Sequence, residues 1–210
     1  MTTVEKRFEM ALLAVDRVVA QESLIEAKRA KIPNNHLEHL IVSTLDRIGQ
    51  MWLDGSVSLS QVYMSGRICE ELVENIFPYA ETDQKPSRKM AIAVLEDYHM
   101  LGKRIVYSML KSAGLGLLDY GHVEVEEIVH RVIEDDIQIL LISTLMLPSA
   151  LHIKDVRTLL RKSGHEPKII VGGAPFRFDD QLWVEVGADA MGRTASDAVK
   201  IVNSIDGGDR

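Results

Sequence analysis

Apolar residues recur with two different periods along this chain. In the N-terminal part the period is helical, and it runs through residues 8–19, 37–48 and 62–76. Turn-forming residues interrupt it at 31–35 and again at 49–60. This pattern predicts a small bundle of four helices in the first part of the chain.

Farther along, short apolar runs alternate with amphipathic segments. The runs lie at residues 90–95, 115–118, 137–142, 168–171 and 188–191, and the helical segments that follow them lie at 105–110, 125–133, 153–160, 182–186 and 198–205. Five strands that each lead into a helix predict a parallel, doubly wound sheet. The run at 137–142 is almost continuously apolar, as a strand covered on both faces requires.

A polar stretch without an apolar period separates the two patterns and contains Pro86. We interpret it as a linker. The predicted domains are a helical bundle at residues 1–82, a linker at 83–88 and a Rossmann-like domain at 89–210. The predicted fold class is therefore α/β, in which a four-helix bundle precedes a flavodoxin-type sheet of five parallel strands.

The overall composition limits the partners that this protein can have. It is 46% hydrophobic and 26% charged, which supports a well-filled core. A formal net charge of −7 argues against a nucleic-acid partner, because phosphate binding normally requires a basic patch. No signal peptide is visible and the apolar runs are too short to span a bilayer, so we expect a soluble, cytoplasmic protein without a membrane partner. The single cysteine, Cys69, excludes an internal disulfide, and we expect it to be a packed side chain.

Residues suited to a binding site gather after the predicted strands. In such a sheet, ligands bind outside the carboxyl ends of the strands, where the strand order reverses. The residues at these ends are Asp97, His99 and Gly102 after the first strand, Ser143, Thr144 and Leu145 after the third, Gly172 and Gly173 after the fourth, and Gly192, Arg193 and Thr194 after the fifth. In extended backbone, Asp97 and His99 would point the same way and address one pocket.

Simpler interpretations of the same residues are open at this point. His99 could be a surface histidine, and Asp97 could cap the helix that begins near Met100. Ser143 could cap the next helix, and the Gly172-Gly173 pair could form only a tight turn.

Taken together, these residues resemble the signature of the methylcobalamin-binding domain. The motif Asp97-x-His99-x-x-Gly102 is followed after 40 residues (103–142) by Ser143-x-Leu145, and after 26 more (146–171) by Gly172-Gly173. Flanking residues 103–106, 171–175 and 187–189 also resemble the family, and residues 48–59 are similar to the connecting segment of its four-helix cap. The resemblance covers nearly the whole chain. It implies one of the small corrinoid proteins of methyltransferase systems.

The resemblance also implies how the cofactor, cobalamin, is held. His99 would be the lower axial ligand to cobalt, in the base-off/His-on arrangement, and Asp97, backed by Ser143, would hold its second nitrogen. The nucleotide tail would lie beside Gly102, Ser143, Leu145, Gly172 and Gly173, and Thr194 is expected to join this cofactor-binding set. The chain differs from the family at 146–150, where threonines are usual, at 191–194, and at Glu96, where glycine is frequent.

The implied function is that of a methyl carrier without catalytic residues of its own. A substrate-specific methyltransferase would load the methyl group, and a second one would pass it to an acceptor such as tetrahydrofolate. These enzymes and a reductive activase would be separate proteins, since 210 residues leave no room for them. Leu59, Val62, Tyr63 and Met64 could cap the cobalt, or could belong to the bundle core. An alternative function is a cobalamin-dependent sensor or antirepressor, and a mutase carrier subunit would normally lack the bundle.

Overall fold

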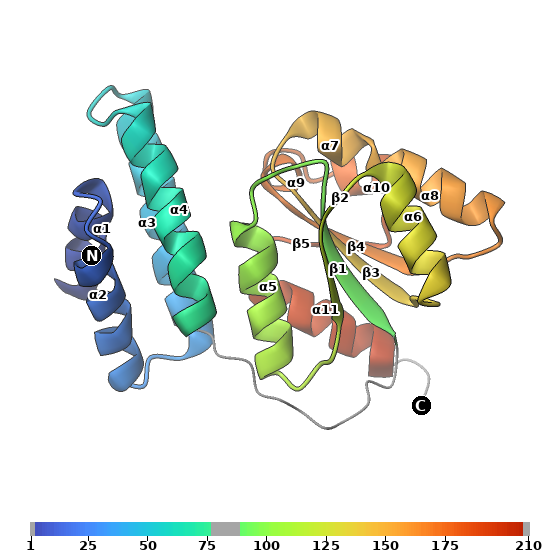
Figure 1. Cartoon of the computed structure of the whole chain (residues 1–210), viewed down its shortest axis with the longest axis horizontal. Coiled ribbons are helices and arrows are strands. Elements are labelled where there is room, and N and C mark those ends of the chain that lie inside the picture. Colours follow the sequence, from blue (N-terminus) through green and yellow to red (C-terminus); the bar gives the residue numbers. More distant parts are fainter. Residues whose placement is uncertain (1–2, 77–88, 208–210) are drawn as a thin grey trace. The chain divides into compact units, whose positions relative to one another are not determined.

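The computed structural model describes residues 3–76 and 89–207 (Figure 1). The chain divides into two compact units, Met1–Pro78 and Tyr79–Arg210. The predicted linker at 83–88 lies outside the described residues, so the predicted domain boundaries around it stay a prediction.

Four helices form the described part of the first unit. They are α1 (Thr3–Leu13), α2 (Arg17–Arg29), α3 (Asn34–Leu53) and α4 (Leu59–Ile76). The helical period through residues 8–19 is divided between α1 and α2, because Val15 is left-handed (φ 56°) and Asp16 caps α2 by accepting a hydrogen bond from Val19 N (3.0 Å). α3 continues past the predicted break at residue 49 and ends at Leu53.

Large apolar side chains fill this bundle. Phe8, Leu12, Leu24 and Ile41 are fully buried. Cys69 in α4 is also buried, and burial raises the pKa of its thiol to about 12. The thiol therefore stays protonated at neutral pH, in agreement with a packed side chain rather than a nucleophile.

The second unit is an α/β domain built on a five-stranded parallel sheet, which confirms the predicted fold class. Its strands are β1 (Met90–Leu95), β2 (Leu118–Val123), β3 (Ile139–Thr144), β4 (Lys168–Gly173) and β5 (Ala190–Gly192), in the order β2-β1-β3-β4-β5. Its helices are α5 (Leu101–Ser112), α6 (Val125–Glu134), α7 (Leu147–Leu151), α8 (Ile153–Lys162), α9 (Ala174–Phe178), α10 (Leu182–Glu185) and α11 (Ala195–Gly207).

Helices cover both faces of the sheet (Figure 1). One face carries Leu140 and Ile142 and packs against α6 and α8, whereas the other carries Ile139 and Leu141 and packs against α5 and α11. Side chains along β3 thus alternate between two apolar layers. This alternation explains why the central strand reads as one continuous apolar run.

The second strand differs most from its prediction. The apolar run at 115–118 predicts a strand there, but β2 spans Leu118–Val123. β2 lies at an edge of the sheet and carries polar residues such as Asp119 and His122, so an apolar run does not mark it. β3 and β4 also extend two residues past their predicted ends, which places Ser143 and Gly172 within strands.

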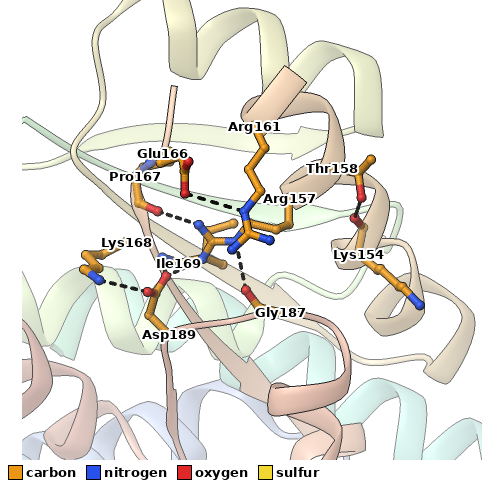
Figure 2. Close-up of polar contacts among 10 residues, drawn as sticks. All are labelled: Lys154, Arg157, Thr158, Arg161, Glu166, Pro167, Lys168, Ile169, Gly187 and Asp189. Atoms are coloured by element: carbon orange, nitrogen blue, oxygen red, sulfur yellow. Dashed lines mark hydrogen bonds and ion pairs between the residues drawn. The ribbon is translucent and has the colours of Figure 1, made fainter. Parts of the chain in front are cut away.

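A polar network joins α8, β4 and β5 at the N-terminal edge of the sheet (Figure 2). The buried Arg157 guanidinium donates hydrogen bonds to the Gly187 carbonyl oxygen (2.8 Å) and to the Asp189 carboxylate. Lys168 Nζ (3.0 Å) and Ile169 N (2.9 Å) also donate to Asp189. Burial by itself raises the pKa of this carboxyl, but the donated hydrogen bonds outweigh burial and hold the pKa below its ordinary value. The Gly187-x-Asp189 segment therefore anchors the edge opposite the predicted site.

Candidate functional site

Two loops meet where the strand order reverses. The reversal lies between β1 and β3, so the β1–α5 loop and the β3–α7 loop leave the sheet toward opposite faces. The first loop carries Asp97 and His99, and the second begins at Leu145. The predicted site residues of these two strand ends therefore lie at one edge of the sheet.

Asp97 ties the two loops together. It is only 6% exposed, and its Oδ2 accepts hydrogen bonds from Leu145 N (2.6 Å) and Met146 N (3.1 Å). The N-cap position of α5 is occupied by Met100 and not by Asp97. The structure thus gives Asp97 a bridging role between loops, and its predicted hydrogen bond to His99 stays a prediction.

Glu96 begins the first loop in a left-handed conformation (φ 51°). Its backbone N donates a hydrogen bond to Val123 O (3.0 Å) of β2, and its carboxylate pairs with His152 Nδ1 at the start of α8. The hydrogen bond to this carboxylate raises the pKa of His152 above its ordinary value. The left-handed backbone explains why glycine is frequent here in the family that the sequence resembles.

His99 lies in the middle of this loop and is half-buried. Tyr98, just before it, is 84% exposed, whereas Asp97 is buried. Asp97 and His99 are therefore turned more toward the protein than the residue between them.

Small residues line one face of the sheet at this edge. β3 pairs with β4 at Ser143 and Gly172, and β4 pairs with β5 at Gly172 and Gly192. Because side chains alternate along a strand, these three residues share the face of Leu141, which is covered by α5 and α11. Side-chain bulk is therefore low at the end of this layer, and the row formed by Ser143, Gly172 and Gly192 is called the slot from here on.

Close backbone approaches account for the predicted glycines. A Cβ on Gly102, in the first turn of α5, would lie 3.3 Å from Ser143 Oγ, and one on Gly172 would lie 3.1 Å from a backbone oxygen of β5. Gly173 has φ 121°, and a Cβ there would lie 1.8 Å from Thr144 O. The structure thus brings Gly102, Ser143, Gly172 and Gly173 together, and Gly173 cannot be replaced without moving the backbone.

The remaining predicted residues lie at the rim of the slot. Leu145 is exposed, and so are Met146 and Leu147 after it, so that this rim is apolar where threonines are usual in the family. Thr194 precedes α11 and caps it reciprocally with Asp197: Thr194 N donates to Asp197 Oδ2 (3.2 Å), and Asp197 N donates to Thr194 Oγ1 (3.1 Å). Thr194 thus has a clear structural role, and its contact with a cofactor stays a prediction.

The structure also tests the simpler interpretations of Ser143 and of the Gly172-Gly173 pair. Ser143 does not cap the next helix, because the N-cap of α7 is Met146. Gly172 lies within β4 rather than in a tight turn, whereas Gly173 is the N-cap of α9. The described residues contain no group of three or more His, Cys, Asp or Glu side chains that could hold a metal ion.

Two residues at this edge are not among those predicted from the sequence, whereas Gly192, which the sequence places at the end of the fifth strand, completes the row of small residues. Tyr98 stacks on His122 of β2, which the shorter prediction for that strand leaves outside the sheet.

No helix in the described part of the chain is long and apolar enough to cross a membrane.

Comparison with known families gives the same division of the chain as the fold. Residues 87–202 match a family described as a B12 binding domain, and residues 4–76 match a second family with the same description. The two matches cover the α/β domain and the helical bundle, respectively.

Several known proteins are similar along nearly their whole length. The trimethylamine corrinoid protein of Methanosarcina barkeri is 30% identical over 203 residues, which cover 92% of each chain. The structure of the monomethylamine corrinoid protein of the same organism superposes with a TM-score of 0.82, at 26% identity, over 94% of this chain and 96% of that one. The methanol:cobalamin methyltransferase complex of M. barkeri contains a chain with a TM-score of 0.52 at 23% identity, over 98% of this chain and 80% of that one. From the two B12 binding matches and the similarity along the full length, we conclude that this chain belongs to the family of B12-binding corrinoid proteins.

Proposed function

We propose that this protein is a corrinoid methyl carrier that holds its cofactor with the nucleotide tail in the slot beside α5 and α11 and with His99 on the cobalt. The observation that carries the proposal is the row of small residues, Ser143, Gly172 and Gly192, next to the loop that bears His99. A slot of this kind, which begins at the reversal of strand order, suits a long, flat ligand tail.

The residues present fit such a group. A Cβ at Gly102 would lie 3.3 Å from Ser143 Oγ, and one at Gly172 would lie 3.1 Å from Gly192 O, so larger residues at either position would crowd this row. Ser143 is the member of this row whose side chain carries a hydrogen-bonding group. Its hydroxyl is therefore the candidate to accept or donate a hydrogen bond when the cofactor is bound.

When bound, the corrinoid supplies a cobalt ion that can accept and release a methyl group. His99 would donate one imidazole nitrogen to that metal, and Asp97 would accept a hydrogen bond from the other nitrogen and so fix the tautomer. The amide groups of Leu145 and Met146 hold the Asp97 carboxylate in place. The orientation of the ligand histidine would therefore depend on both loops.

The names of the related proteins support a carrier rather than a self-sufficient enzyme. They refer to trimethylamine and monomethylamine for two corrinoid proteins and to methanol for a methyltransferase complex, so similar chains carry the names of different methyl compounds. We infer that the donor of this protein, too, is chosen by a separate substrate-specific methyltransferase. A second methyltransferase would receive the methyl group, and a reductive activase would restore an inactivated cofactor.

The helical unit would shield the reactive face of the cofactor. Among the residues predicted for this role, Leu59 and Tyr63 are more than 60% exposed, and Val62 and Met64 are half-buried, so none of them belongs to the bundle core. Trp52 and Leu53 at the end of α3 are also exposed. Together these six side chains give α3 and α4 an apolar tip, and a corrinoid is one ligand that such a surface could cover.

Reconstitution of the full chain with hydroxocobalamin tests the proposal. We expect tight binding and an absorbance spectrum with an imidazole ligand. His99→Ala should retain the folded protein but change the spectrum and weaken binding about tenfold or more, since a metal bond is lost. His130→Ala is the matched control, because His130 is 77% exposed on α6.

Gly102→Ala tests the slot separately. The added methyl group meets only the rotatable Ser143 hydroxyl, and alanine favours a helix, so thermal stability should be kept. Cobalamin binding should weaken, with the spectral type unchanged.

A wild-type chain that binds no cobalamin, or a His99→Ala spectrum identical to that of wild type, would contradict the proposal. Methyl transfer from a methylamine in the presence of a methylamine methyltransferase then tests the carrier role.

A further inference from the structure

A stacked pair of rings joins the loop that bears His99 to the edge strand of the sheet. The rings of Tyr98 and His122 lie 4.5 Å apart between centroids, at an interplanar angle of 11°. Such offset parallel geometry is favourable for aromatic pairs. One face of Tyr98 rests on the imidazole, although the residue as a whole is 84% exposed.

His122 is well placed to support this loop. It lies on β2, where it pairs with Val94 of β1, two residues before the loop begins. Its Nε2 is buried and makes no hydrogen bond within the described part of the chain, and Glu124 Oε1 is 3.7 Å away. The stack on Tyr98 is therefore a principal contact of this ring.

The loop is fixed on its two sides by different kinds of contact. Toward β3, the Asp97 carboxylate accepts two amide hydrogen bonds, and Ser149 Oγ lies 3.5 Å from the Glu96 carbonyl oxygen. Toward β2, the backbone N of Glu96 is bound, and beyond it the Tyr98–His122 stack holds the loop. Because Tyr98 immediately precedes His99, the position of its ring constrains the backbone from which the His99 side chain starts.

We propose that the Tyr98–His122 stack positions His99 for ligation of the corrinoid cobalt. This inference rests on the proposed function, in which His99 is the axial ligand. Tyr98 and His122 are positioning residues: they would act through the loop. Without the stack, the β2 side of the loop loosens and the imidazole reaches the metal in a smaller fraction of molecules.

Two truncations and two ring-preserving variants test this role. Tyr98→Ala and His122→Ala remove the stack, whereas Tyr98→Phe and His122→Phe keep two facing rings. His130→Ala again serves as the matched histidine control, since it lies on the exposed face of α6. Each full-length variant, labelled with ¹⁵N-histidine, is loaded with cobalamin, and the cobalt(II) form is examined by electron paramagnetic resonance. A ¹⁵N-histidine ligand splits the signal into doublets, whereas the cofactor's own ¹⁴N base gives triplets, so the doublet is the nitrogen splitting that this test follows.

Both alanine variants should lower the nitrogen-ligated fraction and weaken cobalamin binding by about 2- to 12-fold, the range expected for one aromatic pair. The phenylalanine variants should restore both values to near wild type. The double alanine variant should be no worse than either single variant, because both changes remove the same interaction. Circular dichroism melting identifies any variant that is merely unfolded, and the ring-preserving variants then decide the question.

The result can overturn this inference without overturning the proposed function. If His99→Ala removes the nitrogen splitting but both alanine variants keep it in full, the stack has no positioning role. The inference is also wrong if Tyr98→Ala has an effect and His122→Ala has none, because Tyr98 then acts alone. If His99→Ala itself leaves the splitting unchanged, the ligand assignment fails, and this inference fails with it.

Discussion

At the scale of single residues, the left-handed backbone of Glu96 is the local feature with the clearest cost. An L-residue in this conformation costs about 1–2 kcal/mol relative to its right-handed form. The conformation turns the chain out of β1 and into the loop that carries His99. Here the side chain adds a contact that glycine cannot make, because its carboxylate pairs with His152.

Glu96→Gln should remove the negative charge that pairs with His152 and leave the backbone of residue 96 unchanged. The pKa of His152 is raised by its hydrogen bond to Glu96, so the stabilisation is fully present below the unfolded value of about 6.5 and is lost as the pH rises through the folded pKa. We therefore expect the wild type to be more stable than Glu96→Gln near pH 6 and the difference to shrink toward pH 9. Urea unfolding at several pH values measures it.

An NMR titration of His152 gives an independent check. Its midpoint should fall toward the ordinary histidine value in Glu96→Gln. A His152 midpoint that is the same in both proteins would show that the pair does not form in solution.

Individual residues also show what the sequence could predict. Asp97, Ser143 and Gly172 could be located because they follow apolar runs in a chain whose strands are parallel. The hydrogen-bond partners of Asp97 could not be located, because Leu145 and Met146 come 48 and 49 positions later in the chain and meet Asp97 only in the folded protein. The role of Thr194 as a helix cap was within reach, since Asp197 stands three residues later.

At the scale of elements, burial decides which strands can be predicted. β1 and β3 are covered on both faces and read as apolar runs, whereas β2 is an edge strand with only Tyr120 and Val123 buried. Because the predicted second strand ended at residue 118, His122 was not expected to lie in the edge strand of the sheet. The division of α1 from α2 depends on one left-handed residue, Val15, which an apolar period cannot indicate.

Asp189→Asn should weaken the N-terminal edge, where α8, β4 and β5 join. The change leaves the Arg157 guanidinium, whose side chain is 7% exposed, without its opposite charge, so we expect a loss of about 2 kcal/mol in the free energy of unfolding at pH 7. The lowered pKa of Asp189 means that this contribution is present above the unfolded value near 3.9 and disappears as the pH falls through the folded pKa.

Urea unfolding of the wild type and the variant at pH 7 and at about pH 3 tests both statements. Cobalamin binding should be unchanged, because the network lies at the edge opposite the slot. Asp180→Asn is a suitable control, since its ion pair with Arg193 is long (3.5 Å) and exposed. Equal stability of Asp189→Asn and wild type at pH 7 would contradict the assigned anchoring role.

At the scale of the whole molecule, the two units carry different surface features. The α/β unit carries the slot and the loop with His99, and the helical unit carries the apolar tip of α3 and α4. The sequence predicted a helical bundle before an α/β domain, and it named four of the six tip residues as possible cap residues. It could not distinguish the tip from bundle core, because apolar residues at helical spacing look alike whether another helix covers them or not.

Tyr63→Ser tests whether this tip protects the cofactor. Tyr63 is 65% exposed, so the free energy of unfolding should change by less than about 0.5 kcal/mol. If the tip covers the corrinoid, the reduced cofactor should be oxidised several-fold faster by dissolved oxygen, as absorbance would record. Met10→Ser on α1 is the control, because Met10 is 70% exposed and is not part of the tip. Equal oxidation rates in all three proteins would exclude a shielding role for Tyr63.

The alternation of side chains along β3, β4 and β5 makes strand length, and not only composition, a property that evolution has to preserve. One residue inserted before Ser143 would present a neighbour from the opposite layer to the slot, and the same shift in β4 would exchange Gly172 for Val171. Later substitutions could put small residues back at the slot positions, but the insertion by itself would leave larger side chains there. Descendants of this chain should therefore gain and lose residues in the connections at the N-terminal edge, while the three strands keep their count.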